Sequence, residues 1–246
     1  MKKQIESIIN KFSNNKIVVL AHGPSLNLFI DNINKVDKNC VIIGCNNWHH
    51  FYNWHPDFWV LSNSELTIKK QYTKINEFKS TTLFYCDSVD LTDKKWVSEV
   101  LSNNYIPYDT RHINREKCGN SACCNHIEKD RLTIQEYLKN YTGYNELYSA
   151  GSSVIVHQLA LAVLLGSDNI YVIGGDLDYT KGYAKNSKNS KPKNLDINNH
   201  RDSILNDIRI INDSAKNKGS NIYTMNPNNN YGVLDYKPLE EIFEKE

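Results

Sequence analysis

The 246-residue chain lacks several features that would place it in a broad class at once. It has no uninterrupted apolar run of the roughly 18 residues that a membrane-spanning helix needs. Its formal net charge of +1 gives no bulk attraction to nucleic acid or to an anionic membrane. Residues 1–10 have the basic start of a secretory signal but neither its continuous apolar core nor its cleavage site. We therefore expect a cytoplasmic protein without a transmembrane segment or a nucleic-acid partner; a peripheral position at the inner membrane surface stays open.

No internal repeat or linker divides the chain, and its length suits one domain. We expect a single nucleotide-binding α/β domain over residues 1–246. Two stretches interrupt the alternation of apolar segments. Residues 103–130 mix polar and aromatic side chains, which we interpret as a small insertion. Residues 180–199 carry lysine among asparagine, serine and glycine, a composition typical of a mobile loop or lid.

Six apolar, β-branched segments recur along the chain and predict strands. Their nearly continuous apolar character is typical of strands buried on both faces of a parallel sheet. Helical patterns lie between them, most clearly at Ser153–Leu165 and His200–Lys218, and residues 5–12 are spaced as an amphipathic helix. The prediction is an open Rossmann-like, mostly parallel sheet with helices on both faces. The predicted strands are Lys16–Ala21, Cys40–Cys45, Asp57–Ser62, Thr81–Cys86, Asn169–Gly174 and Asn221–Met225.

Ligands bind such sheets beyond the carboxyl ends of the strands, so the residues after each strand are the candidates for a site. After the first strand, Gly23 permits close backbone approach and Pro24 suits the first turn of a helix, whose free amides attract an anion. A tight turn without a ligand explains these residues equally well. Small polar residues at the other strand ends can bind a nucleotide or cap helices. The nucleotide-contact candidates are His22, Gly23, Pro24, Ser25, Asn46, Asn47, Asn63, Ser64, Gly151, Ser152, Ser153 and Asp176.

Two groups of side chains could hold a metal, and we favour a metal at neither. Asp176 and Asp178 follow a predicted strand and could bind a divalent cation on a diphosphate. We favour an Asp176 that bonds backbone amides of neighbouring loops and positions them. The second group is a C-x4-C-C-x-H cluster, in which adjacent cysteines rarely both ligate one ion, so a reduced loop or a labile disulfide is the better interpretation. It consists of Cys118, Cys123, Cys124 and His126.

His200 begins a predicted helix directly after the lysine-rich stretch. A histidine at such an edge titrates near neutrality and can act as a general base. A helix-capping or surface histidine is the commoner role, and spacing alone does not separate the two.

Taken in order, these motifs resemble those of two related groups of proteins. Gly-Pro-Ser-Leu after the first strand is similar to the signature of the bacterial sialyltransferases that modify lipooligosaccharide. It also resembles the group of motility-associated flagellin glycosyltransferases and 6-hydroxymethylpterin pyrophosphokinase-like domains. The resemblance spans most of the chain and is weakest in residues 103–130. It rests on residues 18–26, 44–47, 149–151, 170–176 and 200–202.

The resemblance to the sialyltransferases implies a transferase that binds a CMP-sugar and needs no metal or other cofactor. It implies that donor contacts are made by Gly23, Pro24, Ser25, Asn46, Gly151 and Ser152, and Asn63 joins them because it follows the third strand. It also implies that His200 is the base and that Tyr179 and Tyr183 steady the leaving phosphate. The expected activity moves a nonulosonic-acid-type sugar from CMP to a hydroxyl, in surface polysaccharide biosynthesis. The implied partners are the nucleotide-sugar donor and a glycan or protein acceptor, and a homo-oligomer is compatible with this function.

Two alternatives stay open. The pterin-kinase resemblance implies an ATP-dependent diphosphotransferase that requires Mg²⁺. That group carries paired aspartates after the third strand, where this chain has Leu61–Glu65 without them, although Asp176 and Asp178 could substitute. The other alternative is a non-catalytic nucleotide-binding module. The chain also departs from the sialyltransferases, which have asparagine in place of His22 and a shorter helix after Gly151.

Overall fold

The computed structural model describes residues 4–46, 48, 54–61, 81–86, 105–110, 132–149, 153–178, 184, 197–228 and 232–244. They form one sheet of eight strands in the order β5-β4-β3-β2-β1-β6-β7-β8, and all neighbouring strands run parallel. The open, parallel α/β sheet predicted from the sequence is confirmed. The strands are β1 (Ile17–Leu20), β2 (Val41–Cys45), β3 (Phe58–Leu61), β4 (Thr82–Cys86), β5 (Tyr105–Tyr108), β6 (Asn169–Ile173), β7 (Asn221–Thr224) and β8 (Asp235–Tyr236).

The central strand β1 shows why these segments are continuously apolar. All of its residues are buried, and successive side chains point to opposite faces of the sheet. Ile17 and Val19 pack into the cluster that contains α5, whereas Val18 and Leu20 pack into the cluster that contains α1. Because both faces are covered, no position of the strand can be polar.

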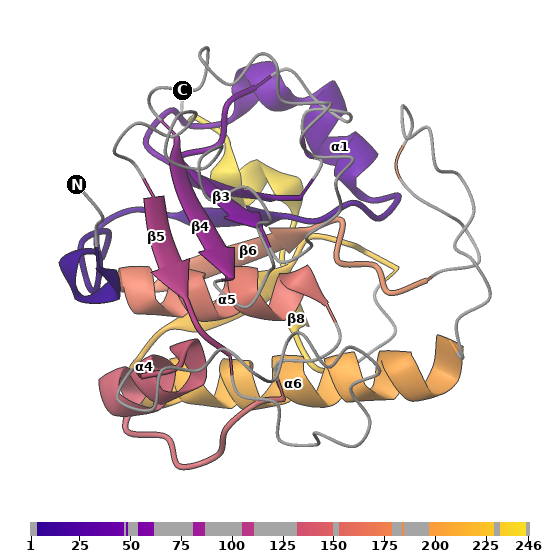
Figure 1. Ribbon diagram of the computed structural model, residues 1–246. Coiled ribbons are helices and arrows are strands. Elements are labelled where there is room, and N and C mark those ends of the chain that lie inside the picture. The colour runs from indigo at the N-terminus through magenta and orange to yellow at the C-terminus, as the bar shows by residue number, and fades with distance from the viewer. Residues whose placement is uncertain are drawn as a thin grey trace, which may run out of the picture.

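Helices cover both faces of the sheet, as expected (Figure 1). On one face, α5 packs against the central strands, and α4 and α6 pack against α5. On the other face, α1 packs with two 3-10 helices, η2 and η7. The bounds are α1 (Leu26–Asp31), α4 (Ile134–Thr142), α5 (Val154–Leu165), α6 (Ile197–Asn217), η2 (Ile33–Lys35) and η7 (Leu239–Ile242).

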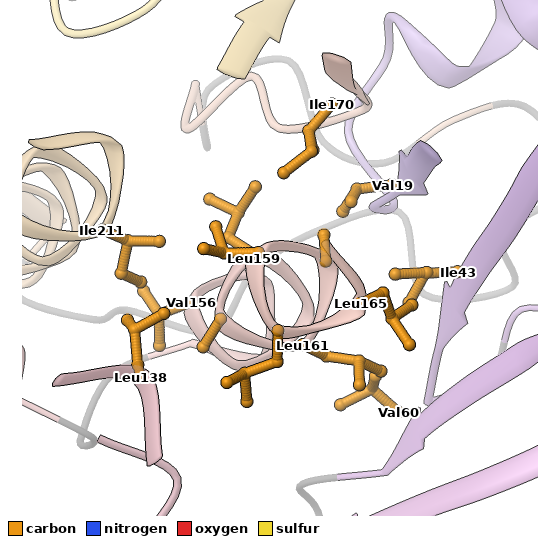
Figure 2. Close-up of a cluster of buried hydrophobic side chains, with 14 of the residues drawn as sticks. Val19, Ile43, Val60, Leu138, Val156, Leu159, Leu161, Leu165, Ile170 and Ile211 are labelled. Carbon is orange, nitrogen blue, oxygen red and sulfur yellow. The ribbon is translucent and has the colours of Figure 1, made fainter. Parts of the chain in front are cut away.

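Helix α5 is the centre of the larger cluster. All of its residues except Val154 are buried, because it contacts three strands, α4 and α6 at once. Figure 2 shows its side chains pointing in all directions, with Val156 toward Ile211 of α6 and Leu165 toward Ile43 of β2. An all-round apolar helix is stable only in such a position. The apolar pattern of Ser153–Leu165 thus predicted both the helix and its burial.

Two strands lie outside the six predicted segments. β5 lies at the start of residues 103–130, so this stretch begins with the edge strand of the sheet and not with an insertion; residues 111–130 lie outside the described part of the chain. Pro107 obscured β5 because proline breaks a strand pattern, yet it is tolerated at the edge of a sheet. β8 is two exposed residues long, too short for any periodic signal.

Two helix predictions also change. Residues 5–12 form the single 3-10 turn η1 (Ile5–Ser7) followed by turns, although Ile5 and Ile8 are buried as the spacing indicated. α6 begins at Ile197, inside the stretch predicted as a lid. Among the helices that the structure describes, none is both long and apolar enough to cross a membrane.

The packing of α5 predicts a large difference between two leucines. Leu161→Ala should lower the free energy of unfolding by about 2–5 kcal/mol, because Leu161 is fully buried and its removal leaves a cavity. The control Leu28→Ala, at a 42% exposed position of α1, should change it by less than about 0.5 kcal/mol. Urea unfolding measures both, and equal losses would contradict the described packing.

Candidate functional site

The candidate site lies where the chain changes direction across the sheet. From β1 the strands proceed outward to β5 on one side, and the chain then returns to place β6 on the other side of β1. The loops that follow β1 and β6 therefore stand at the point where the strand order reverses, beside which ligands usually bind in open α/β sheets. These loops, defined here as residues 21–25 and 174–178, are called the β1 loop and the β6 loop.

Hydrogen bonds join the β1 loop and the β6 loop directly. The Gly23 amide donates to the Gly174 carbonyl at 2.7 Å, and the Gly174 amide donates to Ser25 Oγ at 2.8 Å. The Ser25 amide donates to Asp176 Oδ2 at 2.7 Å. Asp176 is 5% exposed, and its second oxygen accepts from Asn226 Nδ2, after β7, at 2.5 Å. Asp176 thus makes the loop-positioning contact that the sequence favoured.

Glycine is required at two of these positions. A Cβ atom on Gly23 would collide with the Asp176 carboxylate and with the carbonyl of Gly174. Gly174 has a φ of 75°, and a Cβ atom there would collide with the carbonyl of Ala21. The two loops approach each other at backbone distance because neither glycine has a side chain.

This contact changes the expected role of the β1 loop. The amides of Gly23 and Ser25, predicted as anion donors, already donate to acceptors in the β6 loop. The next amide, Leu26, donates to the Gly23 carbonyl, and Pro24 has none. The described geometry therefore gives these amides a structural function. A ligand at this edge would meet side chains such as His22 and Asn46, which are half-buried.

The end of β2 adjoins the β1 loop. His22 Nε2 lies 3.5 Å from Cys45 Sγ, whose thiol is itself 3.6 Å from the carbonyl of Leu20. Burial raises the pKa of the Cys45 thiol, so it stays protonated and is not a nucleophile at neutral pH. The next residue, Asn46, has a φ of 36° and is held through its backbone by Val60 and Trp59. Asn46 therefore lies directly after β2, at the carboxyl end of the strand, and is half-buried.

Gln158 of α5 is hydrogen-bonded to the ends of β1 and β2. Its Nε2 donates to the carbonyls of Leu20 in β1 and Ile43 in β2, at 3.0 and 3.1 Å, and the side chain is fully buried. These bonds connect the helix to the strand ends on which His22 and Asn46 are mounted.

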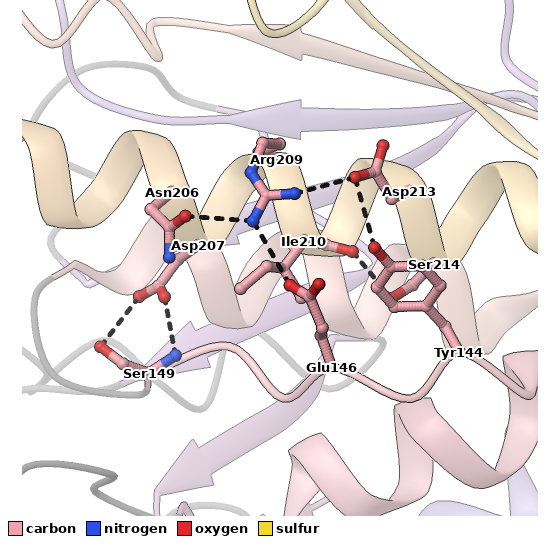
Figure 3. Close-up of polar contacts among 9 residues, drawn as sticks. All are labelled: Tyr144, Glu146, Ser149, Asn206, Asp207, Arg209, Ile210, Asp213 and Ser214. Atoms are coloured by element: carbon pink, nitrogen blue, oxygen red, sulfur yellow. Dashed lines mark hydrogen bonds and ion pairs between the residues drawn. The ribbon is translucent and has the colours of Figure 1, made fainter.

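The segment that leads into α5 is held from α6. Asp207 Oδ1 accepts from the Ser149 amide at 2.7 Å, and Oδ2 lies 3.4 Å from Ser149 Oγ (Figure 3). Asp207 is 1% exposed. Burial raises the pKa of Asp207 to about 7, and the Ser149 bonds only partly offset this. Ser153 occupies the N-cap position of α5 with extended backbone and no side-chain cap bond.

The predicted site residues are described to different extents. The structure brings together His22, Gly23, Pro24, Ser25 and Asp176 at the β1 and β6 loops, with Asn46 at the neighbouring strand end and Ser153 at the start of α5. His200 lies in the first turn of α6, but its side chain is not described. Outside the described residues lie Asn47, Asn63, Ser64, Gly151, Ser152, Tyr179, Tyr183 and the cluster Cys118, Cys123, Cys124 and His126.

Three residues of this region were missed by the sequence analysis, and each carries a signal. Asp207 interrupts the apolar stripe of α6, and Gln158, next to His157, is polar in a helix whose other residues are apolar. Asn226 follows a strand as the other candidates do. In addition, the Ala184 amide donates to the His22 carbonyl at 2.9 Å, so the predicted lid contacts the β1 loop at this residue.

The described carboxylates do not fit a metal site. Both oxygens of Asp176 already accept hydrogen bonds from protein groups. Within the residues that the structure describes, no three His, Cys, Asp or Glu side chains are grouped to hold an ion.

Comparison with known proteins finds similarity to both groups that the sequence motifs resemble. A family model described as 6-hydroxymethylpterin diphosphokinase MptE-like matches residues 1–182. No curated protein matches the sequence.

Solved structures of sialyltransferases match nearly the whole chain. CstII from Campylobacter jejuni, in complex with cytidine-5'-monophosphate as a substrate analogue, superimposes with a TM-score of 0.52 at 13% identity, covering 95% of this chain and 88% of CstII. The monofunctional α-2,3-sialyltransferase Cst-I from the same organism gives 0.53 at 16% identity, covering 97% and 85%. CST-II with a trisaccharide acceptor and CMP gives 0.52 at 12%, covering 94% and 89%. At these identities the likeness establishes a shared fold.

The bonds to Asp176 predict a specific loss of stability. Asp176→Ala should lower the free energy of unfolding by about 2–4 kcal/mol, because the buried Ser25 amide and the Asn226 side chain lose their acceptor. Asp31→Ala, which removes an exposed carboxylate at the end of α1, should be neutral within about 0.5 kcal/mol. Chemical denaturation compares them, and a neutral Asp176→Ala would show that the loops hold together without this carboxylate.

Asp207 predicts a pH dependence of stability. Because its folded-state pKa, about 7, lies above the ordinary value of 3.8, its contribution is fully present below pH 3.8 and is lost as the pH rises from there through 7. Between about pH 5 and about pH 8, the wild type should lose about 2 kcal/mol more than Asp207→Asn, which cannot ionise. Parallel pH profiles of unfolding for the two proteins would rule out this titration.

Proposed function

The chain belongs to the 6-hydroxymethylpterin diphosphokinase MptE-like family, and on this premise we propose that it is a nucleotide-dependent transferase. Its donor lies across the carboxyl ends of β1, β2 and β6. The donor that the site supports best is a CMP-sugar, from which a nonulosonic-acid-type sugar is transferred to a hydroxyl of a glycan or protein.

The observation that carries this choice is how far the sialyltransferase likeness extends. The family model ends at residue 182, whereas the sialyltransferase structures cover 94–97% of the chain, beyond that point. The part of the chain that is covered only by the sialyltransferase structures contains α6, in which His200 lies in the first turn and Asp207 lies seven residues later. Two of these structures were determined with CMP, which supports cytidine as the nucleoside.

The carboxylates at this edge also favour a donor that binds without a divalent cation. A diphosphotransferase that uses ATP needs acidic side chains free to hold Mg²⁺ against the phosphates. Asp176, the first acidic residue after β6, already accepts hydrogen bonds from Ser25 and Asn226 through its two oxygens. A sugar phosphodiester carries less charge than a triphosphate and can be neutralised by hydrogen bonds alone.

In the proposed reaction the acceptor hydroxyl oxygen bonds to the anomeric carbon while the bond from that carbon to the CMP phosphate breaks. His200 accepts the hydroxyl proton, and CMP leaves as the anion. Tyr179 and Tyr183 donate hydrogen bonds to the departing phosphate. The amides of Gly23 and Ser25 do not take this role, because they hold the β1 loop against the β6 loop. His22 and Asn46 are the side chains assigned to donor contact.

The family description favours a second candidate, a diphosphotransferase that moves the terminal diphosphate of ATP to a pterin-like alcohol. In that case Mg²⁺ would have to be held by residues other than Asp176, whose two oxygens already accept hydrogen bonds. This candidate requires ATP with Mg²⁺ where the first requires a CMP-sugar, so a nucleotide-binding experiment distinguishes the two.

Nucleotide binding and turnover test the proposal together. CMP and the non-transferable analogue CMP-3FNeuAc should raise the melting temperature without added metal, whereas stabilisation by ATP–Mg²⁺ alone would establish the second candidate instead. With CMP-N-acetylneuraminic acid and a sugar acceptor, release of CMP should fall about 100-fold or more in His200→Ala. The control His55→Ala changes an exposed histidine before β3 and should keep full activity. Equal rates in both variants would remove His200 from the mechanism.

A further inference from the structure

Asp207 is a buried acid that the proposed reaction does not use. It lies on α6, and its two oxygens contact one residue, Ser149, through the backbone amide and the hydroxyl (Figure 3). The side chain is 1% exposed. It therefore joins two segments that are 58 residues apart in the chain.

No cation compensates this carboxylate among the ion pairs of the described residues. The guanidinium of Arg209, two positions along the same helix, pairs with Glu146 and Asp213. Residues two positions apart lie on nearly opposite sides of a helix, so Arg209 faces solvent while Asp207 faces the core. Burial accordingly raises the pKa of Asp207 to about 7, and no charged neighbour contributes to this shift.

A buried carboxylate without a cation costs stability that a leucine of similar shape would not. What the carboxylate provides is two acceptors at a defined place. The Ser149 amide is bound at 2.7 Å, the distance of a strong, charge-assisted bond. An acidic side chain at position 207 is therefore explained by its two contacts with Ser149 and not by apolar packing.

Each of the two segments joined by Asp207 is close in sequence to a residue of the proposed site. His200 lies seven residues earlier in α6, two helical turns away on the same side of the helix. Ser149 lies four residues before Ser153, which occupies the N-cap of α5 and is a donor-contact candidate. The bond between Asp207 and Ser149 therefore anchors the chain, four residues before the N-cap of α5, to the helix that carries the proposed base.

We propose that Asp207 is a positioning residue: through Ser149 it fixes the entry into α5 against α6 and so aligns the donor contacts at Ser153 with His200. This inference rests on the function proposed above. It assigns Asp207 no contact with the substrate. Its effect is on donor binding, with a smaller effect on the chemical step.

Three substitutions separate positioning from packing. Asp207→Leu keeps the branching of the heavy atoms but removes both acceptors, and Asp207→Ala is the second variant if the larger leucine prevents folding. Asp207→Asn keeps an oxygen for the Ser149 amide and has an NH₂ group that can donate to the Ser149 hydroxyl. It should therefore retain the wild-type contact with Ser149. The matched control is Asp213→Asn, on the same helix, where the carboxylate contacts Arg209 and Tyr144 (Figure 3).

The first measurement is independent of the reaction. Hydrogen exchange of a peptide that spans residues 145–149 should be at least about tenfold faster in Asp207→Leu or Asp207→Ala, because the Ser149 amide loses its acceptor. Asp207→Asn and Asp213→Asn should exchange as the wild type does. Wild-type exchange in the leucine or alanine variant would overturn the proposal, whatever the activity of the chain.

The second measurement concerns the donor. The acceptor-removing variants should raise KM for the CMP-sugar about tenfold or more while kcat falls less, and Asp207→Asn should restore KM. An unchanged KM with faster exchange would overturn the alignment of donor contacts while leaving the structural bond. If no CMP-sugar is turned over by the wild type, the proposed function fails by its own assay, and the exchange measurement still decides the role of Asp207.

Discussion

The carboxylate of Asp176 holds together the loops that leave the centre of the sheet. One oxygen accepts from Ser25 after β1, and the other accepts from Asn226 after β7. Because the carboxylate itself follows β6, three strand ends are connected by a single side chain. A buried carboxylate is stable only when both oxygens are bonded, so the acid and its two donors depend on one another. The relative position of these three strand ends depends on this set of bonds.

Helix α5 connects these strand ends to the hydrophobic core. Gln158 bonds the carbonyls of Leu20 and Ile43, and the rest of α5 is packed on all sides by apolar residues. A helix so enclosed cannot shift without displacing strands and helices together. The strand ends that carry His22 and Asn46 therefore rest on a rigid support. Such support suits a site whose contacts must be held at fixed distances.

Much of the fold could be predicted because burial on both faces leaves a direct record in the sequence. β1 and α5 are continuously apolar since each is covered on every side. β5 was missed because an edge strand tolerates Pro107, and an edge need not be apolar throughout. The rule that ligands bind at strand ends placed His22–Ser25 and Asp176 in one region, and the structure brings them into contact.

What could not be predicted were the partners of individual polar groups. The amides of Gly23 and Ser25 looked free because local sequence does not show that a loop about 150 residues later supplies their acceptors. Asp207 was passed over for the same reason, since its partner Ser149 belongs to another element. Pairings of this kind depend on how distant segments meet, and a single sequence carries no periodic signal for them.

The pairing of β1 with β6 has a consequence for synthesis of the protein on the ribosome. Ser25 and its acceptor Asp176 are 151 residues apart, and β6 borders the central strand. At about 5–20 residues per second, translation of the intervening chain takes roughly 8–30 s. During that interval one edge of β1 lacks the strand that pairs with it in the folded protein, and its backbone N–H and C=O groups on that side are unpaired. The central position of the site in the sheet thus makes its assembly one of the last events of folding.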